Sequence, residues 1–392
     1  MNLDREDHEL QLRQMIRATL AATLDGEFST HTDFPYFSTR NSYDMFTEID
    51  GLPLFPERFP EVFSRWAGLE AGKQIGREDI LVLDLETTGL GRGQTLAFMI
   101  GLGYYEDGRY VVEQLFLPEP EAEANSFDRL IELVSEKSVL ITFNGKTFDV
   151  PILESRLLYH HIWLDLRSLT HIDLLHIARR LWKNKIPSCA LETIEFYILG
   201  HIREKELDIE GGLIPQTYFQ YLINGDAELM RRVFLHNQLD VLHTAALFTL
   251  ICDLAGYPQE QGFNQRIDYH ALARLYLSQG DRETARAILT DLLAQNILSG
   301  DIACELGLIN KQEGDAEAAA SCFALASSLG HPGGRLEQAK LLEKRKEYGE
   351  ALDLSEKLLH WHLGLPRINA RQVGELEKRI LRLRRKLGIM GF

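Results

Sequence analysis

Two carboxylates interrupt a short apolar run at residues 80–86, which read Ile-Leu-Val-Leu-Asp-Leu-Glu. An apolar run of this length predicts a buried strand, whose side chains alternate between two faces. Asp84 and Glu86 are two residues apart, so both point to the same face. Two acids on one face of a buried strand cost free energy unless a cation binds them, and hard divalent cations take oxygen ligands. The run therefore favours a metal-binding strand, and a solvent-facing pair of acids at a strand end is the alternative.

Further strands and helices follow this run. Phe98–Tyr105 and Tyr110–Leu117 are predicted strands joined by the turn at 106–108, and Val139–Phe143 is another buried strand. Helical spacing of apolar residues is found at Ala122–Lys137, Val150–Tyr159, Leu174–Trp182, Leu191–Leu199 and Ala227–Leu254. Consecutive strands followed by strands that alternate with helices indicate an α/β or α+β layered domain over residues 76–258.

The first 75 residues are interpreted as a leader that packs on this domain. A helix is predicted over Leu10–Leu24, and prolines at positions 53, 56 and 60 break regular structure after it. Aromatic residues gather between them, and such side chains are rarely left in water. They are Phe34, Tyr36, Phe37, Tyr43 and Phe46.

From residue 264 to 392 the pattern is helical only, and it repeats. Gly280-Asp281 recurs 34 residues later as Gly314-Asp315, and Leu272-Ala273 recurs as Leu306-Gly307. A glycine-aspartate turn between two helices, with small residues where the helices approach, resembles the tetratricopeptide repeat (TPR). An ordinary helical bundle is the alternative. In either case residues 264–392 are predicted to form a docking surface for a protein partner.

Two more acids complete a set of four. Asp149 follows the predicted strand Val139–Phe143 and a glycine-containing turn, where capping of the next helix is the structural alternative. Asp240 lies in a predicted helix, one turn after His236. A histidine beside a carboxylate near a metal could transfer protons, because its ordinary pKa is about 6.5. A surface ion pair is the alternative for these two residues.

An Asp-x-Glu strand, a later Asp and a helical Asp preceded by His resemble the acid set of the DEDD exonucleases. Residues 80–252 more broadly resemble the YprB-like ribonuclease H-like family. The matching stretches are Thr87-Thr88-Gly89-Leu90, residues 143–149, His171-Ile172-Asp173-Leu174-Leu175 with Arg179-Arg180, and residues 236–240. The resemblance implies a ribonuclease H-like α/β domain, a mixed sheet flanked by helices.

The resemblance also implies a mechanism and a site. Two Mg²⁺ or Mn²⁺ ions would be held by Asp84, Glu86, Asp149 and Asp240, about 3.5–4 Å apart, and would assist an in-line phosphodiester hydrolysis. His236 would accept the proton of the attacking water. Relatives have a tyrosine four residues before the last Asp or a histidine five before it, whereas here the histidine is four before. Substrate contacts are predicted for Thr87, Thr88, Asn144 and Lys146, with local turn capping as the alternative. Asp173 is expected to orient the structure.

Composition excludes several other classes. The net charge is −16, which argues against a broad phosphate-binding surface but not against a local groove. A cluster of basic residues at 371–386 either touches nucleic acid or forms a solvated helix face. The four cysteines form no metal-binding pair, and the amino-terminal residues contain no signal-like apolar segment. No apolar run is long enough to span a bilayer, so a cytoplasmic protein without membrane contact is expected. His160-His161 and His360-x-His362 are interpreted as surface histidines of helices.

Two functions are therefore weighed. The first is a 3′→5′ exonuclease that hydrolyses single-stranded DNA or RNA with two divalent cations. The second is a weakly active or inactive nuclease-like scaffold, which binds protein partners through its TPR-like arm. Retention of four ordered acids favours the enzyme, since a scaffold has no need for clustered carboxylates.

Overall fold

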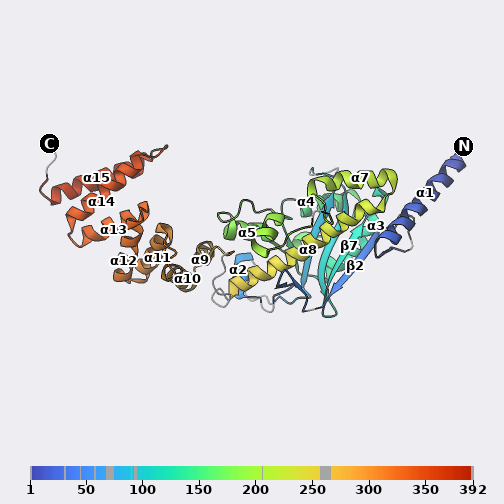
Figure 1. The fold of residues 1–392 in the computed structure, drawn as a ribbon, viewed down its shortest axis with the longest axis horizontal. Coiled ribbons are helices and arrows are strands. Elements are labelled where there is room, and N and C mark those ends of the chain that lie inside the picture. The colour runs from blue at the N-terminus through green and yellow to red at the C-terminus, as the bar shows by residue number, and fades with distance from the viewer. Residues whose placement is uncertain are drawn as a thin grey trace. The chain divides into compact units, whose positions relative to one another are not determined.

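The computed structural model describes residues 2–30, 32–44, 46–56, 59–67, 75–89, 91, 95–204, 206–256 and 266–389. The chain divides into two compact units, residues 1–267 and 268–392. The first unit is built on a mixed sheet with helices on both faces, and the second is entirely helical in its described residues (Figure 1).

The sheet of the first unit has seven strands in the order β1-β2-β7-β6-β5-β8-β9. Neighbouring strands are antiparallel except for β5 with β8 and β8 with β9, which are parallel. The strands are β1 (Gly26–Phe28), β2 (Phe37–Tyr43), β5 (Ile80–Thr87), β6 (Ala97–Glu106), β7 (Arg109–Phe116), β8 (Val139–Thr142) and β9 (Thr170–Asp173). A separate small hairpin consists of β3 (Glu48–Ile49) and β4 (Leu52–Pro53). The mixed α/β architecture predicted from the sequence is confirmed.

Strands β1 and β2, which come from the first 75 residues, are part of this sheet. Strand β2 pairs with β7 along its whole length, from Phe37 opposite Phe116 to Tyr43 opposite Tyr110. Among the aromatic residues of this region, Phe37 is fully buried, whereas Phe46 is 82% exposed. Strand β2 was not predicted because five of its seven residues are polar, and polar residues obscure the apolar alternation that marks a strand.

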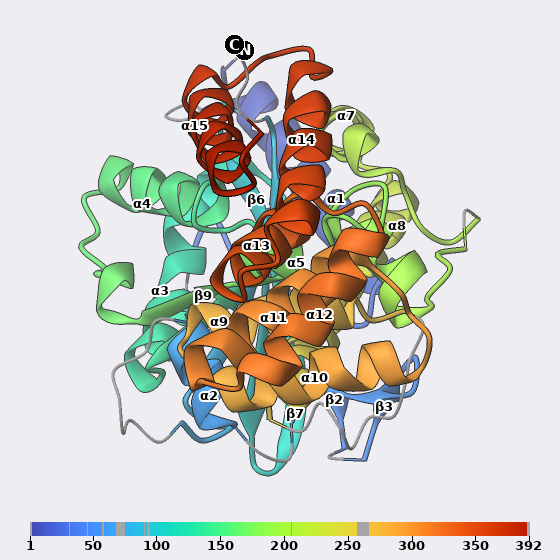
Figure 2. The same cartoon turned by 90° about the vertical axis from the view of Figure 1, so that its left-hand side faces the viewer.

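Helices cover both faces of the sheet (Figure 2). On one face, α3 (Glu123–Glu136) and α4 (Asp149–Tyr159) pack on a core that contains Leu81, Leu83 and Leu85 of β5. On the other face lie α1 (Asn2–Thr23), α7 (Ile214–Asn224) and α8 (Ala227–Gly256), whose core includes Phe98 and Phe116. Shorter helical elements of this unit are α2 (Glu61–Ala67), η1 (Pro120–Ala122), η2 (Leu166–Ser168), α5 (Leu174–Trp182), α6 (Leu191–Ile194), η3 (Glu195–Leu199) and η4 (Gly211–Leu213).

The 30-residue helix α8 crosses the sheet and contacts β5, β6 and β7 (Figure 1). Contrary to the expectation from the sequence, α8 is long and apolar enough to span a bilayer by length and composition. Its most apolar window is 78% buried inside the structure, as in a core helix. Burial on most sides explains its weak amphipathicity, because nearly every face of α8 meets protein.

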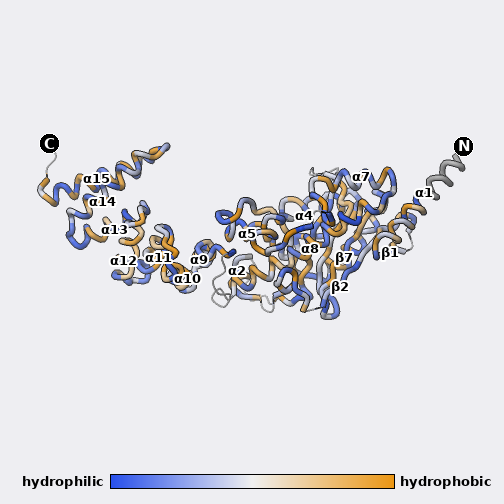
Figure 3. Tube along the Cα trace, in the orientation of Figure 1, coloured by the Kyte–Doolittle hydropathy of each residue, from blue (hydrophilic) through white to orange (hydrophobic). Residues whose placement is uncertain are grey.

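The second unit consists of stacked helix pairs, with apolar and polar residues alternating along them (Figure 3). The predicted turns are observed: Gly280 and Gly314 have positive φ, which favours glycine, and Asp281 and Asp315 cap the helices that follow. The helices are α9 (Tyr269–Ser278), α10 (Arg282–Ala294), α11 (Gly300–Glu313), α12 (Ala316–Ser328), α13 (Pro332–Lys344), α14 (Tyr348–Leu363) and α15 (Ala370–Lys386).

Candidate metal centre

The acids of β5 face helix α8. Leu81, Leu83 and Leu85 point into the core beneath α3 and α4, so the alternation of a strand sends Asp84 and Glu86 to the opposite face. Glu86 is buried, and Asp84 is half-buried. The predicted placement of both carboxylates on one face is therefore observed.

Asn237 of α8 holds the Asp84 carboxylate. Its Nδ2 donates to Asp84 Oδ2 at 2.9 Å, and its Oδ1 accepts from Gln114 Nε2 of β7 at 2.9 Å. Gly101 of β6, directly opposite Asp84 in the sheet, makes room for this contact. A Cβ at Gly101 would lie 2.3 Å from Asn237 Oδ1, closer than real Cβ atoms approach. The sheet thus lacks a side chain beside Asp84 so that an amide from α8 can reach the acid.

Asp149 reaches the same place from the other side of β5. It is the first residue of α4, it is buried, and its carboxylate accepts a hydrogen bond from the backbone N–H of Leu85. The turn before it is held by buried Asp173, which accepts from the backbone N–H groups of Asn144 at 2.9 Å and Lys146 at 3.0 Å. Asp173 also caps α5. It therefore orients the structure, as expected from the sequence.

Asp240 joins the cluster from α8 and carries an ion pair with Arg203. The Arg203 guanidinium also forms two hydrogen bonds of 2.6 Å with Glu195 and an ion pair of 3.2 Å with Asp208. Glu195 and Arg203 are almost fully buried. Arg203 thus places a positive charge at one edge of the acid cluster, and its pairs with Glu195 and Asp208 hold it there.

The charges of neighbouring acids raise the pKa values of three of these carboxyl groups. Burial raises the pKa of Asp84 well above its usual range, and the charges of Asp240, Glu86 and Asp149 raise it further. Burial, with Asp240 and Asp149, raises the pKa of Glu86 to about 8 against the opposing charge of His236. Burial also raises the pKa of Asp149 to about 7. Acids far apart in the sequence therefore share one poorly solvated site, where like charges repel.

His236 lies at the edge of this site, between Asp208 and Asp240. Its Nδ1 is 2.9 Å from Asp208 Oδ1, and its Nε2 is 3.8 Å from Asp240 Oδ2. Burial lowers the pKa of His236, but the hydrogen bond to Asp208 and the charges of Asp240 and Glu86 outweigh burial and raise the pKa to about 9. Among these protein groups the imidazole is protonated at neutral pH.

The four residues predicted to contact substrate surround the acids but make local contacts. The Thr87 hydroxyl donates to the Gly89 carbonyl at 2.8 Å, and the Thr88 hydroxyl accepts from the Leu96 N–H at 3.0 Å. Asn144 has positive φ, and its Oδ1 accepts from the Thr147 hydroxyl at 2.8 Å. The Lys146 side chain is exposed. The hydroxyl of Thr87 and the amide of Asn144 therefore make local turn contacts, the hydroxyl of Thr88 contacts the backbone of Leu96, and the Lys146 side chain faces solvent.

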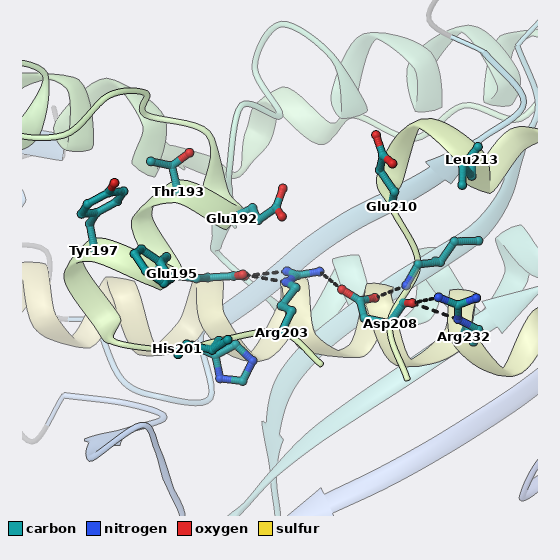
Figure 4. A pocket seen from close by; sticks show the side chains of 13 residues that line it. Glu192, Thr193, Glu195, Tyr197, His201, Arg203, Asp208, Glu210, Leu213 and Arg232 are labelled. Atoms are coloured by element: carbon teal, nitrogen blue, oxygen red, sulfur yellow. Dashed lines mark hydrogen bonds and ion pairs between the residues drawn. The ribbon is translucent and has the colours of Figure 1, made fainter. Parts of the chain in front are cut away.

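A cavity of about 820 Å³ opens beside Arg203 (Figure 4). Arg203, Asp208 and Arg232 line it, and Figure 4 shows Arg203 bridging Glu195 and Asp208. Apolar side chains complete the wall: Phe196, Tyr197, Ile202 and Leu213, each about half or more exposed. The cavity therefore has exposed aromatic and aliphatic side chains beside Arg203 and Arg232, and Arg203 connects it to the acid cluster through Asp240.

The acid set suits divalent cations. Buried carboxylates with raised pKa values are costly to ionise together, and a hard cation with oxygen ligands removes that cost. In the described residues no three of these acids bring their ligand atoms within 4.8 Å of one another. The four acids therefore lie further apart than the ligands of one tightly bound ion.

Four residues around the acids were not predicted from the sequence: Asn237, Arg203, Asp208 and Glu195. A signal existed for Asn237, because it precedes Asp240 by three residues and so lies on the same helix face. For the other three no local pattern was available, since residues 195–204 and 206–208 consist of a π-helical turn and irregular chain.

Comparison with known proteins agrees with this geometry. Residues 81–252 match the RNase_H superfamily, and this range contains all four acids. The uncharacterized protein YprB of Bacillus subtilis (strain 168) is 31% identical over an alignment of 377 positions, which covers 89% of this chain and 88% of that protein. The chain belongs to the YprB family. The similarity to YprB extends through most of both units, and the superfamily match indicates nuclease-type activity, which generally depends on divalent metals.

Proposed function

We propose that this YprB-family chain is a metal-dependent 3′→5′ exonuclease that hydrolyses phosphodiester bonds of single-stranded DNA or RNA. The observation that carries the proposal is the meeting of Asp84, Glu86, Asp149 and Asp240 where helix α8 packs on strand β5, so that their charges act on one another. Perturbed carboxylates with specific charged partners are typical of functional sites. The RNase_H superfamily match over the same residues supports the reaction class.

The four acids would hold two Mg²⁺ or Mn²⁺ ions. When bound, such ions lower the pKa of a water and stabilise the charge of the leaving oxygen. Asn237 keeps the Asp84 carboxylate oriented, and the Leu85 N–H does the same for Asp149. Arg203 holds Asp240 in position through its pair with Glu195. Because these contacts are buried, the ligands are positioned before the substrate arrives.

His236 has two possible protonation roles at this site. Next to the acids alone it is protonated, and it then acts as a cation that stabilises Asp240 and the scissile phosphate. Cations at the site would oppose the charges that raise its pKa, and a neutral His236 could then accept the proton of the attacking water. Asp208 holds Nδ1 in either case, which leaves Nε2 facing the acids.

The neighbouring cavity supports a single-stranded substrate. Exposed Phe196 and Tyr197 offer ring faces on which unpaired bases can stack, and stacking of this kind tolerates any sequence. Arg232 lies in the same cavity, and exposed Lys146 lies on the turn before Asp149. These groups would contact phosphates, and Thr87, Thr88 and Asn144 would lie beside the terminal nucleotide.

Incubation of the full chain with single-stranded DNA and RNA oligonucleotides, labelled at the 5′ or at the 3′ end, tests the proposal. With Mn²⁺ or Mg²⁺, a 5′ label should appear in a ladder of shortening products, and a 3′ label should be released as a mononucleotide. EDTA should abolish both signals. Loss of a metal ligand typically lowers the rate by several orders of magnitude, so the cleavage rates of Asp84→Asn and Asp240→Asn should be too low to detect.

Asp128→Asn is the matched control, because Asp128 is an exposed acid of the same unit. It should cleave at the wild-type rate. Absence of hydrolysis with either cation would contradict the proposal, and so would cleavage that persists unchanged in Asp84→Asn. Products that begin at internal positions would retain the nuclease but reject the 3′→5′ direction.

A second function is supported by the helical unit. Helices α14 and α15 enclose a groove of about 510 Å³, whose lining includes Leu359, Leu363, Ile380 and Leu381. A nuclease-like scaffold that binds a protein through its TPR-like arm would use such a surface. Capture of one partner by residues 264–392, combined with inert full-length protein in the cleavage experiment, would favour this second function over the first.

A further inference from the structure

A second cluster of metal-ligand side chains lies outside the four acids. Asp50, His201 and His243 bring one ligand atom each within 4.8 Å of one another, and no other such trio is found in the described ranges. Asp50 is in the turn between β3 and β4, His201 follows η3, and His243 lies in α8. Three segments that are distant in the sequence therefore meet at two imidazoles and one carboxylate.

The distances within this trio are those of ligands around one small cation. Asp50 Oδ2 is 3.0 Å from His201 Nδ1 and 3.2 Å from His243 Nε2. Ligands about 2.0–2.1 Å from a tetrahedral Zn²⁺ are separated from one another by about 3.3 Å. The His201 and His243 rings lie side by side, with centroids 4.3 Å apart. The three ligand atoms therefore surround a space in which one small cation could bind.

His243 provides an independent sign of a ligand. Its side chain is fully buried, yet its Nε2 makes no hydrogen bond despite the 3.2 Å approach to Asp50. Buried polar atoms normally have a partner, so this nitrogen is costly as it stands. Its other nitrogen, Nδ1, is 2.9 Å from Glu195 Oε1. A carboxylate on one nitrogen orients the other toward a metal, as in carboxylate–histidine–zinc arrangements.

We propose that Asp50, His201 and His243 bind one Zn²⁺ or a similar transition-metal cation, with Glu195 orienting His243. Imidazole and carboxylate ligands suit such cations, whereas the all-oxygen site formed by the four acids suits Mg²⁺ or Mn²⁺. Three protein ligands leave a coordination position for water. His201 also lines the cavity described above, beside the Glu195–Arg203 pair (Figure 4), so that position is within reach of solvent.

The two sites are linked through buried charges. Glu195 contacts both His243 and Arg203, and Arg203 pairs with Asp240. A cation on His243 and His201 would fix the segment that carries Arg203 against α8. The cation therefore acts as a positioning element for Asp240, and its binding does not depend on the exonuclease function proposed above.

Zinc binding by the full-length chain tests the inference. Protein stripped with a chelator is dialysed against Zn²⁺, bound metal per chain is measured by mass spectrometry, and affinity is measured by competition with a chromophoric chelator. Wild type should retain one tight equivalent. His201→Ala and Asp50→Asn should lose it, and Glu195→Gln should weaken it about 10–100-fold. His201→Ala and Asp50→Asn should still fold, because both side chains are partly exposed. Asparagine also tolerates the positive φ of residue 50.

Two controls locate the site. Asp84→Asn should retain the tight zinc, and so should His360→Ala, which removes an exposed histidine of the helical unit. Melting curves report folding separately: Zn²⁺ should raise the Tm of wild type and of both controls but not that of His201→Ala. Wild type without tight zinc, or undiminished zinc in His201→Ala and Asp50→Asn, would overturn the inference. Zinc that is lost only in Asp84→Asn would also overturn it, because the metal would then belong to the four acids.

Discussion

At the acid cluster, the size of individual side chains matters as well as their charge. Gly101 leaves room for Asn237, and Asn237 in turn supplies the only side-chain hydrogen bond to Asp84 found in the described residues. The amide is fully buried and also accepts from Gln114. A buried acid is therefore oriented by a neutral donor, which lowers its pKa slightly while the other acids raise it.

Replacement of this donor should weaken metal binding without destroying the fold. In Asn237→Ala the Asp84 carboxylate loses its orienting contact, so the affinity for Mn²⁺ should fall about 10–100-fold. Loss of the two buried hydrogen bonds should lower the free energy of unfolding by about 1–3 kcal/mol. Isothermal titration with Mn²⁺ and urea unfolding measure the two effects. Gly101→Ala should behave similarly by displacing Asn237, whereas Gly349→Ala, which meets open space, should not.

Metal binding should strengthen as pH rises through the raised pKa values of the acids. Glu86 and Asp149 have pKa values of about 8 and 7, so below these values a cation must displace protons. The apparent Mn²⁺ affinity should therefore increase from about pH 6 to about pH 9. Titration in buffers of different ionisation enthalpy should show proton release that shrinks toward high pH. Affinity that is constant over this range would contradict the assignment of these acids as ligands.

The same groups predict how stability depends on pH in the presence of EDTA. A carboxyl group with a raised pKa contributes stability that is present below its unfolded value, about 4.3 for Glu and 3.9 for Asp, and is lost as pH rises through the folded value. His236, with its pKa raised to about 9, contributes in the same direction. The Tm should therefore fall between about pH 5 and pH 9, and added Mn²⁺ should reverse most of that fall.

At the scale of elements, the mostly apolar strands and the long apolar helix were predicted from the sequence, and the mostly polar strands were not. Strands β5 to β8 and helix α8 agree with the expectation within a few residues. Strand β9 reads Thr-His-Ile-Asp, and β2 is mostly polar, so neither shows the alternation of a half-buried strand. Strand β9 forms at the edge of the sheet because it pairs with β8, and β2 forms because it pairs with β7. Both strands therefore depend on the rest of the sheet.

The turn between β8 and α4 depends on one buried acid of another strand. Asp173→Ala should remove the acceptor for the N–H groups of Asn144, Lys146 and Leu175, so unfolding should become easier by about 2–4 kcal/mol. Asp149 should then be misplaced, so the cleavage rate should fall as well as the free energy of unfolding. Asp165→Ala, which removes an exposed cap, should cost less than about 1 kcal/mol and leave cleavage unchanged.

At the scale of the whole molecule, both proposed metal sites belong to one of the two units. Each unit has apolar clusters of its own, and all four acids, the cavity and the proposed zinc site belong to residues 1–267. The basic residues at 371–386 are in part paired within the second unit, since Arg379, Arg382 and Lys386 contact Glu343. This pairing favours a solvated helix face over a nucleic-acid contact at that cluster.

Removal of the second unit should therefore spare hydrolysis. A chain ending at residue 267 should keep its fold and cleave a short single-stranded oligonucleotide at about the rate of the whole chain, because independent cores fold independently. Circular dichroism and the 5′-label experiment measure the two properties. A fragment that is folded but inactive would show that residues 268–392 complete the substrate site.

The sequence alone determined the local features of this protein: the strand with Asp84 and Glu86 on one face, the helices, and the 34-residue repeat with its capped turns. Such features follow from side-chain periodicity and turn chemistry, which act over a few neighbouring residues. Only the tertiary structure decided which side chains that are distant in the sequence meet one another. Asn237 reaches Asp84 across a glycine, Arg203 pairs with Asp240, and Asp50 joins His201 and His243. These contacts depend on how helix α8 packs on the sheet, and packing joins residues that no local pattern relates.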